Sequence, residues 1–223
     1  MCFTLTCKAL QFFRLTHKRF HFVRSVKIRN FVLMKRHFNT HIEGLDLNFW
    51  HDLIESRGTL VTLQAGECLC RKGEPTNKFG YVKSGYLKYG ITELNNRELL
   101  GGFAFPDALF GDYPSCMYNK PALFDIVAGR KTELWVMDST ELFDLYEEHA
   151  EIGRQGRLFM ESAYNSLLRR YYAMYSQTPT ERYLDLIHAH PQIEQDVPQK
   201  EIAEYLQITP VHLCRIRKEL MKQ

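Results

Sequence analysis

The carboxyl-terminal residues 210–223 carry basic and apolar side chains at the spacing of one amphipathic helix. Leu213, Ile216 and Leu220 share one face of this helix. The other positions include the side chains that could contact DNA, which are His212, Arg215, Arg217, Lys218 and Lys222. An exposed arginine can donate two parallel hydrogen bonds to the N7 and O6 atoms of a guanine. We therefore expect Arg215 to read a base and Lys218 to bind a phosphate.

A helix that reads DNA needs a second helix to hold it in the groove, and the preceding residues supply one. Residues 201–208 have a helical apolar pattern, in which Ala203 is small enough for a close helix crossing. Thr209 and Pro210 then have the residue types of a helix N-cap and first position. Two helices joined by a short turn indicate a helix-turn-helix, although an ordinary helical hairpin has the same outline. The expected DNA-binding residues are Gln199, Lys200, Thr209, Pro210, Val211, His212, Arg215, Arg217 and Lys218.

A further helix is expected ahead of this pair. Thr178 and Glu181 form a capping-box pattern around Pro179, and Pro191 ends the helical stretch. Residues 178–223 hold six Lys or Arg against seven Asp or Glu, so the segment as a whole is not basic. One copy should therefore bind DNA weakly, and a dimer that reads two half-sites could compensate.

Residues 138–177 are expected to form one long helix, since no proline interrupts them and Asp138 can cap the start. Apolar and small residues recur along it at steps of three and four, which is the spacing of a seam between two helices. The predicted dimer contacts are Ile152, Gly156, Phe159, Ala163, Ser166 and Leu167. The alternative is a helix that packs on the sheet of its own chain. We favour a parallel homodimer.

Residues 59–137 have the pattern of short strands. Glycines and other turn residues separate the β-prone runs at the spacing of an antiparallel sandwich or barrel. The expected strands cover 59–63, 68–71, 79–82, 86–91, 97–103, 125–129 and 133–137. Gly66, Gly73 and Gly85 fall in the turns, and we expect each of them to have a positive φ.

The first residues differ in charge from the rest of the chain. The formal net charge is +3, but residues 1–40 hold nine Lys or Arg and no Asp or Glu. The basic extension 1–33 fits a phosphate-binding arm, a targeting peptide, or a stretch that the native protein lacks if translation begins at Met34. We favour the last interpretation, because the sequence after Met34 leads directly into an amphipathic helix.

The strand-rich region resembles the β-roll of cyclic nucleotide-binding domains. The motif of that family is matched by Gly66, Leu69, Gly73, Tyr81, Val82 and Gly85. With the long helix and the terminal helix pair, residues 40–223 are similar to transcription regulators of the Crp/Fnr family. The short members from Bacteroidetes-type bacteria are the most similar. Where the reading helix of better-known members begins Ser-Arg-Glu, this chain has Thr209, Pro210 and Val211, so its base preference should differ.

The resemblance implies an α+β fold with three parts after the basic extension. Residues 34–137 are expected to form an antiparallel β-roll, which is a double-stranded β-helix of the jelly-roll type. Residues 138–177 are expected to be the dimerisation helix. Residues 178–223 are expected to be a DNA-binding helix-turn-helix domain without a full wing.

The effector site of that family departs from its pattern here. In the family, a Gly-Glu turn and an arginine about ten residues later hold the ribose and phosphate. Here Asp112 follows Gly111, and the arginine place falls at Ala122. A buried phosphodiester needs a cation, so cyclic AMP is not expected to bind. The altered effector pocket comprises Gly111, Asp112, Tyr113, Lys120, Ala122 and Leu123. An apolar ligand, a different anion held by Lys120, and no ligand are all compatible with the sequence.

The remaining features indicate a regulator and exclude other classes of protein. No nucleophile–base pair, P-loop or metal-ligand cluster occurs, so we expect no enzyme, catalytic residue, metal site or cofactor. The six cysteines form no C-x-x-C pair, and there is no apolar run of about 18 residues. We expect a cytoplasmic bacterial homodimer that binds double-stranded DNA, with no membrane contact. RNA polymerase and an unidentified small-molecule effector are the further expected partners.

An alternative function is compatible with the same elements. The chain could be a small-molecule-sensing signalling protein whose helix-turn-helix binds a protein partner. Binding of duplex DNA distinguishes the two functions, because only the regulator should select a DNA sequence.

Overall fold

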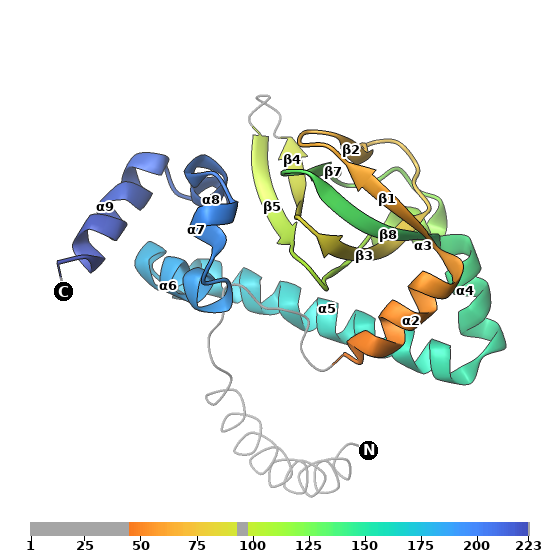
Figure 1. Ribbon diagram of the computed structural model, residues 1–223. Coiled ribbons are helices and arrows are strands. Elements are labelled where there is room, and N and C mark those ends of the chain that lie inside the picture. Colours follow the sequence, from red (N-terminus) through yellow and green to blue (C-terminus); the bar gives the residue numbers. More distant parts are fainter. Residues whose placement is uncertain (1–44, 93–97, 223) are drawn as a thin grey trace, which may run out of the picture. The chain divides into compact units, whose positions relative to one another are not determined.

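The computed structural model describes residues 45–92 and 98–222. The basic extension 1–33 lies outside the described residues, so its predicted alternatives stay predictions. In Figure 1 the described strands gather into a β-roll, and helices precede and follow it along the chain.

The roll contains every strand that the sequence predicts, with ends that shift by one or two residues. These strands are β1 (Thr59–Leu63), β2 (Cys68–Cys70), β3 (Lys78–Ser84), β4 (Leu87–Thr92), β5 (Glu98–Ala104), β7 (Asp125–Ala128) and β8 (Thr132–Asp138). The sequence did not predict β6 (Leu109–Phe110) or the helix α3 (Tyr113–Tyr118). Both are too short for a periodic pattern to reveal them.

The described strands pair into two four-stranded antiparallel sheets. Their orders are β1-β8-β3-β6 and β2-β7-β4-β5. Val82, Leu87 and Leu134 face the space between the sheets and are completely buried. Strand alternation places these side chains inside, so the hydrophobic pattern fixes which face of each sheet is the core. The predicted antiparallel β-roll is confirmed.

Three turns of the roll depend on glycine. Gly66, Gly73 and Gly85 have φ angles of 84°, 86° and 84°, so the predicted positive φ is confirmed at each. Gly85 also lies so close to Thr132 that an added Cβ would be 2.5 Å from the threonine Oγ1. Both the backbone angle and the contact therefore exclude a larger residue there.

Helix α2 (Leu47–Arg57) closes one end of the roll. Asp46 caps it by accepting a hydrogen bond from the Phe49 backbone N–H at 3.1 Å. Trp50 and Ile54 are completely buried and belong to a cluster with Phe79 of the roll. The amphipathic pattern after Met34 thus yields a helix whose apolar face completes the core.

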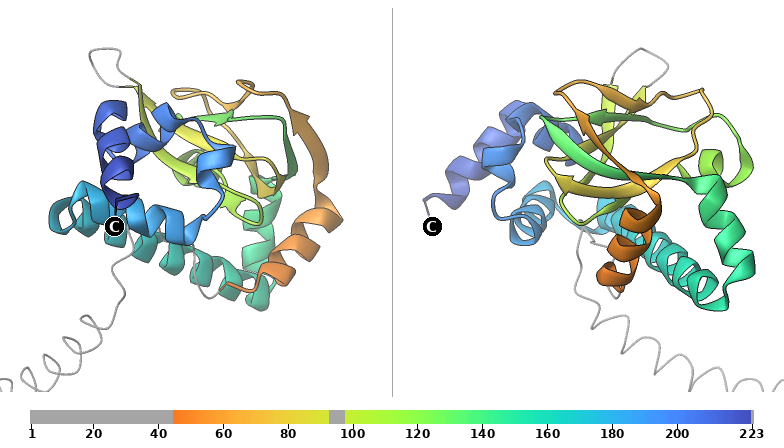
Figure 2. Two further views of the ribbon diagram at one scale, coloured as in Figure 1. Left: turned by 60° about the vertical axis from the view of Figure 1, so that its left-hand side comes forward. Right: turned by 45° about the vertical axis from the view of Figure 1, so that its right-hand side comes forward.

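The single helix predicted for 138–177 is divided in the structure. Helix α4 (Ser139–Glu148) ends at His149, whose φ and ψ of −126° and 105° are extended, and α5 (Ala150–Ser176) then begins. The two helices pack against each other because Gly153 and Gly156 leave room for Tyr146. Both views in Figure 2 show α5 running along the roll after this bend. The sequence pattern missed the bend because His149 carries no helix-breaking signal of its own.

Four short helices complete the chain. They are α6 (Pro179–Ala189), α7 (Ile193–Asp196), α8 (Gln199–Tyr205) and α9 (Pro210–Leu220). Thr178 accepts a hydrogen bond from the Glu181 backbone N–H, and the Glu181 carboxylate accepts one from the Thr178 backbone N–H. The predicted capping box at the start of α6 is therefore confirmed.

Replacing Thr178 by alanine should lower the free energy of unfolding by about 1 kcal/mol, because it leaves the Glu181 backbone N–H without its side-chain acceptor. The midpoint of urea unfolding, followed by circular dichroism, measures this change. Thr180→Ala is the matched control, since Thr180 lies inside the helix and the cap stays intact. Equal midpoints for the two variants would contradict a contribution from the cap.

Candidate nucleic-acid interface and effector cassette

Helices α8 and α9 are joined by the tight turn that the sequence predicts. Gln207 adopts a left-handed φ of 57°, and the Ile208 backbone N–H donates to the Ala203 carbonyl at 3.0 Å. Thr209 caps α9 by accepting from the His212 backbone N–H at 3.2 Å, and Pro210 follows at the first helical position. The cap, the proline and the turn together fix the direction in which α9 leaves α8.

The two helices cross closely over a shared apolar cluster. Ala203 and Leu206 are completely buried, and they belong to one cluster with Leu213 and Ile216 of α9. The predicted role of Ala203 is consistent with this packing, since a larger side chain has no space there. Burial of Leu213 and Ile216 turns the opposite face of α9 outward.

That outward face holds most of the predicted DNA-binding residues. Val211 is 62% exposed, and His212, Arg215 and Lys218 are also exposed. Beside them, a surface groove runs between α9 and the start of α6, where Thr180 and Thr209 line it. In Figure 1, α9 lies on the side of α8 that faces away from the roll. The face is therefore open to a large partner.

Arg217 and Lys200, two of the predicted DNA contacts, lie beside carboxylates of the same chain. The Arg217 Nε lies 2.9 Å from the Glu194 carboxylate, which also accepts a hydrogen bond from the Tyr183 hydroxyl at 2.6 Å. Burial, reinforced by Glu194, raises the pKa of the Tyr183 hydroxyl. Arg217 thus joins α9 to α7. Lys200 lies in a groove between α8 and the roll, 3.7 Å from Glu204, while Gln199 is exposed beside it at the start of α8.

Helix α8 contacts the roll through a carboxylate that the sequence did not reveal. Glu201 accepts from the Lys88 Nζ at 2.6 Å and from the Tyr86 hydroxyl at 3.2 Å. The same interface includes an ion pair of 2.6 Å between Arg130 and Asp196. These partners lie more than 60 residues apart, so no local pattern could have predicted them. Together they hold the terminal helices against the sheet that contains β4.

Helix α5 contacts α8 through Arg170. Its guanidinium lies 3.9 Å from the centre of the Tyr205 ring and donates to the Tyr205 carbonyl at 3.0 Å. Burial lowers the pKa of Arg170 from its ordinary value. The stacked arrangement suits a guanidinium, which is planar and weakly hydrated. Arg170 and Tyr205 therefore connect the long helix directly to the helix before α9.

The segment that holds the predicted effector pocket, residues 111–123, is called the cassette below, and it uses Asp112 for its own structure. Asp112 is 1% exposed, and its Oδ1 caps α3 by accepting from the Ser115 backbone N–H at 3.1 Å. Its Oδ2 accepts from the Leu123 backbone N–H at 2.7 Å. Both carboxylate oxygens are thus bonded within the cassette, where the resembled family would offer a carboxylate to a ribose.

The other predicted cassette residues do not converge on one pocket. Ala122 is buried, and its backbone bonds to Glu74 and Gly73 across the roll. Tyr113, Lys120 and Leu123 are exposed, and the Lys120 Nζ lies 5.5 Å from the centre of the Tyr118 ring. Of the six residues predicted to form the effector pocket, Gly111, Asp112 and Ala122 are thus at least partly buried. The other three lie on the surface.

Tyr89 of β4 lies beside Gly111 and Asp112 of this cassette. The sequence did not predict this position. Its ring meets Phe124 edge to face at 6.1 Å. Burial raises the pKa of its hydroxyl, and the Asp112 carboxylate adds to the shift while the Gly111 backbone N–H opposes it. The Tyr89 phenol therefore lies close to both the Asp112 carboxylate and the Gly111 backbone. A tyrosine within a β-prone run carries no sequence signal for this position.

Three of the six residues in the predicted dimer seam, Gly156, Phe159 and Ser166, face their own chain. An added Cβ at Gly156 would lie 2.5 Å from the Tyr146 ring, and the Phe159 ring packs 5.8 Å from Trp50. Ser166 lines a cavity beneath the roll, and Ile152 and Ala163 are half-buried. Leu167 is the one exposed residue of the six predicted for the seam, with 65% of its surface accessible. The close approach predicted for Gly156 thus occurs with α4 of the same chain.

A different stripe of α5 is apolar and exposed. It consists of Tyr164, Leu167, Tyr171 and Tyr175, which recur at steps of three and four residues. The Tyr171 and Tyr175 rings lie 5.0 Å apart. Four neighbouring large side chains on one exposed face are unusual for a helix that contacts only water.

No helix in residues 45–92 and 98–222 is long and apolar enough to cross a membrane. The same residues contain no group of three His, Cys, Asp or Glu side chains that could hold a metal ion.

Residues 60–149 match the family of cyclic nucleotide-binding domains. No curated protein matches the chain in sequence. Among solved structures, FixK2 from Bradyrhizobium japonicum is similar, with a TM-score of 0.62 and 15% identity. The similarity covers 74% of this chain and 85% of FixK2.

Two further regulators have the same fold. The c-di-GMP-responsive global regulator CLP from Xanthomonas campestris has a TM-score of 0.60 and 16% identity, over 79% of this chain and 92% of CLP. A transcriptional regulator assigned to the Crp/Fnr family, from Eubacterium rectale, has a TM-score of 0.60 and 17% identity, over 78% of this chain and 82% of its own. The predicted Crp/Fnr-type fold is confirmed.

Proposed function

We propose that this chain, whose fold is that of the Crp/Fnr regulators, is a homodimeric transcription regulator that reads double-stranded DNA with α9. The observation that carries the proposal is the outward face of α9, where His212, Arg215 and Lys218 are exposed while Leu213 and Ile216 anchor the helix. The first turns of such a helix can reach base edges in the major groove.

Dimerisation is part of the proposal, because one terminal domain has too few basic residues to bind tightly. Two copies joined along α5 would place two α9 helices on one duplex and add their phosphate contacts. The exposed stripe of Tyr164, Leu167, Tyr171 and Tyr175 supports this arrangement. We place the dimer seam on this stripe, since Gly156 and Phe159 are occupied within the chain.

Cyclic AMP is not the proposed effector. Both Asp112 oxygens are bonded within the cassette, and a buried alanine stands at the arginine place. A phosphodiester moved into this environment would lose its hydration without gaining a cation. DNA binding is therefore expected to be independent of cyclic AMP.

Selection from random duplex DNA with the full-length protein tests the proposed function. We expect a two-fold symmetric motif whose half-sites lie about one helical turn apart, and the same motif with cyclic AMP present. Recovery of no motif would contradict the proposal and favour a protein partner for α8 and α9. A motif that appears only with cyclic AMP would contradict the proposed cassette.

Replacing Lys218 by alanine should weaken binding to all DNA sequences alike, because its exposed ammonium is placed for a phosphate. The slope of log affinity against log salt concentration should fall by about 1. Titrations of the selected motif and of unrelated DNA at several salt concentrations measure both effects. A loss confined to one base pair of the motif would contradict the phosphate assignment.

A further inference from the structure

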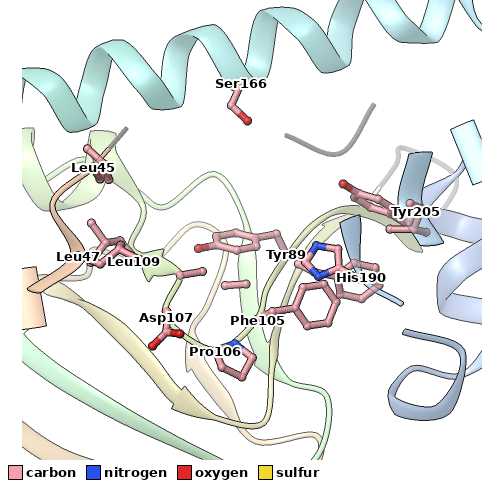
Figure 3. A pocket seen from close by; sticks show the side chains of 14 residues that line it. Leu45, Leu47, Tyr89, Phe105, Pro106, Asp107, Leu109, Ser166, His190 and Tyr205 are labelled. Carbon is pink, nitrogen blue, oxygen red and sulfur yellow. The ribbon is translucent and has the colours of Figure 1, made fainter. Parts of the chain in front are cut away.

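A cavity of about 380 Å³ lies where the roll meets the helices that carry α9. In Figure 3, Ser166 of α5 points into it from one side, opposite Tyr89 and Phe105 of the roll. His190, which follows α6, lies beside Phe105, and their ring centres are 4.2 Å apart. The volume is within the range of small-molecule sites, and segments distant in sequence converge on it.

The described lining residues are mainly aromatic and aliphatic. They include Tyr89, Phe105, Leu186 and Tyr205, and none of the described lining residues is Lys or Arg. The described wall therefore offers no permanent cation to a carboxylate or phosphate. The exposed Asp107 carboxylate at the rim would repel an anion. Flat aromatic ligands suit such walls, because their rings can pack edge to face or offset against Phe105.

One wall of the cavity belongs to the connection between the roll, α5 and α8. The Tyr205 ring lies 5.0 Å from the Phe103 ring of β5, and Arg170 of α5 packs on Tyr205 at 3.9 Å. The next carbonyl, that of Leu206, accepts from Arg182 of α6 at 3.1 Å. A ligand that contacts Tyr205 would therefore stabilise one position of α8 over others, which is the requirement for a ligand to shift a conformational equilibrium.

We infer that this cavity is the effector site of the protein and that it takes a small, uncharged aromatic molecule. The inference rests on the proposed function, since an effector presupposes a regulated protein. Tyr89 lines the cavity and lies close to Asp112, so the ligand site adjoins the cassette without including its residues. The bound ring packs against Phe105 and Tyr205, whose rings both line the cavity, and holds α8 against the roll.

Calorimetric titration of the full-length protein with indole tests the site without DNA. We expect a dissociation constant below about 1 mM, which is reachable for a ligand of this size. Indole-3-acetate has the same ring and a carboxylate, and it should bind at least about fivefold more weakly. Cyclic AMP should not displace indole. Equal binding of the two indoles, displacement by cyclic AMP, or no indole binding would each overturn the inference.

Two variants locate the site. Phe105→Ala removes a wall, and Leu47→Trp fills the rim at a residue that is already exposed, so at least one should fold normally. Each should weaken indole binding about fivefold, as expected for one aromatic contact. Tyr118→Ala, an exposed ring outside the cavity, is the control. Indole binding unchanged in Leu47→Trp would place the ligand elsewhere.

Hydrogen exchange tests the effect on α8 independently of DNA. The amides of residues 199–206 should exchange about threefold more slowly with saturating indole, because the ligand stabilises the docked position of the helix. Unchanged exchange would contradict the regulatory part of the inference. A failed DNA selection would leave these two results unaffected, so the two proposals can fail separately.

Discussion

Replacing Leu167 by glutamate should convert the protein into a monomer and weaken DNA binding at least a hundredfold. Leu167 lies in the middle of the exposed stripe on α5, between Tyr164 and Tyr171. In a dimer that buries this stripe, the carboxylate would lose its hydration without a partner of opposite charge. The two reading helices would then no longer be linked, and linkage of two binding modules alone contributes about 10²- to 10⁴-fold.

Light scattering at micromolar concentration measures the dissociation, and titration of the selected motif measures the loss of affinity. Asn165→Glu is the matched control. This substitution adds the same charge, but Asn165 is exposed on another side of α5. At protein concentrations low enough for both variants to be monomers, their midpoints of thermal unfolding should be similar. Leu167 packs little within its own chain, so its replacement should not change the stability of the monomer. A Leu167→Glu protein that remains dimeric would exclude the stripe as the interface.

The elements that the sequence predicted well are those fixed by local chemistry. Thr178 and Thr209 cap helices through hydrogen bonds that span three residues, so their signals lie within a short stretch. The turns at Gly66 and Gly73 follow from the conformational freedom of single residues. Such features need no knowledge of the rest of the chain.

Several features that the sequence did not predict depend on packing that periodicity does not encode. The spacing along α5 reveals an apolar stripe but cannot show whether the partner is another copy or the chain itself. Gly156 was assigned to a dimer, and its neighbour is Tyr146, because the chain bends at His149. Glu201 meets Lys88 across 113 positions, which no helical pattern encodes. Long-range packing therefore decides which of two plausible surfaces is used.

Arg217 of α9 is another residue whose contact is decided by a partner distant in sequence. Its replacement is also the control for the replacement of Arg215. Periodicity places both arginines on the polar side of the helix, yet Arg217 is paired with Glu194 while Arg215 is exposed. Replacing Arg217 by alanine leaves the Glu194 carboxylate with the Tyr183 hydroxyl alone. We therefore expect lower stability and weaker binding to every sequence, with the base preference unchanged.

Replacing Arg215 by alanine should remove the preference for one base pair in each half-site. A bidentate arginine–guanine contact discriminates by about 1–3 kcal/mol, so the preference for the correct base pair over other pairs should fall by roughly 5- to 150-fold. Binding to the selected motif and to duplexes with single base substitutions measures this preference. Fold stability should change little, because the side chain is exposed.

The comparison of the two arginine variants decides how α9 meets DNA. Two results would show that α9 does not enter the groove with its exposed face, which lies opposite Leu213 and Ile216. One is that Arg215→Ala keeps the full base preference, and the other is that Arg217→Ala loses it. The pair also separates reading from positioning, because only a residue that touches a base can change the motif without changing affinity for unrelated DNA. The side chains of Pro210 and Val211 at the start of α9 carry no hydrogen-bond donors, so direct base readout should fall to Arg215, with His212 as its exposed neighbour.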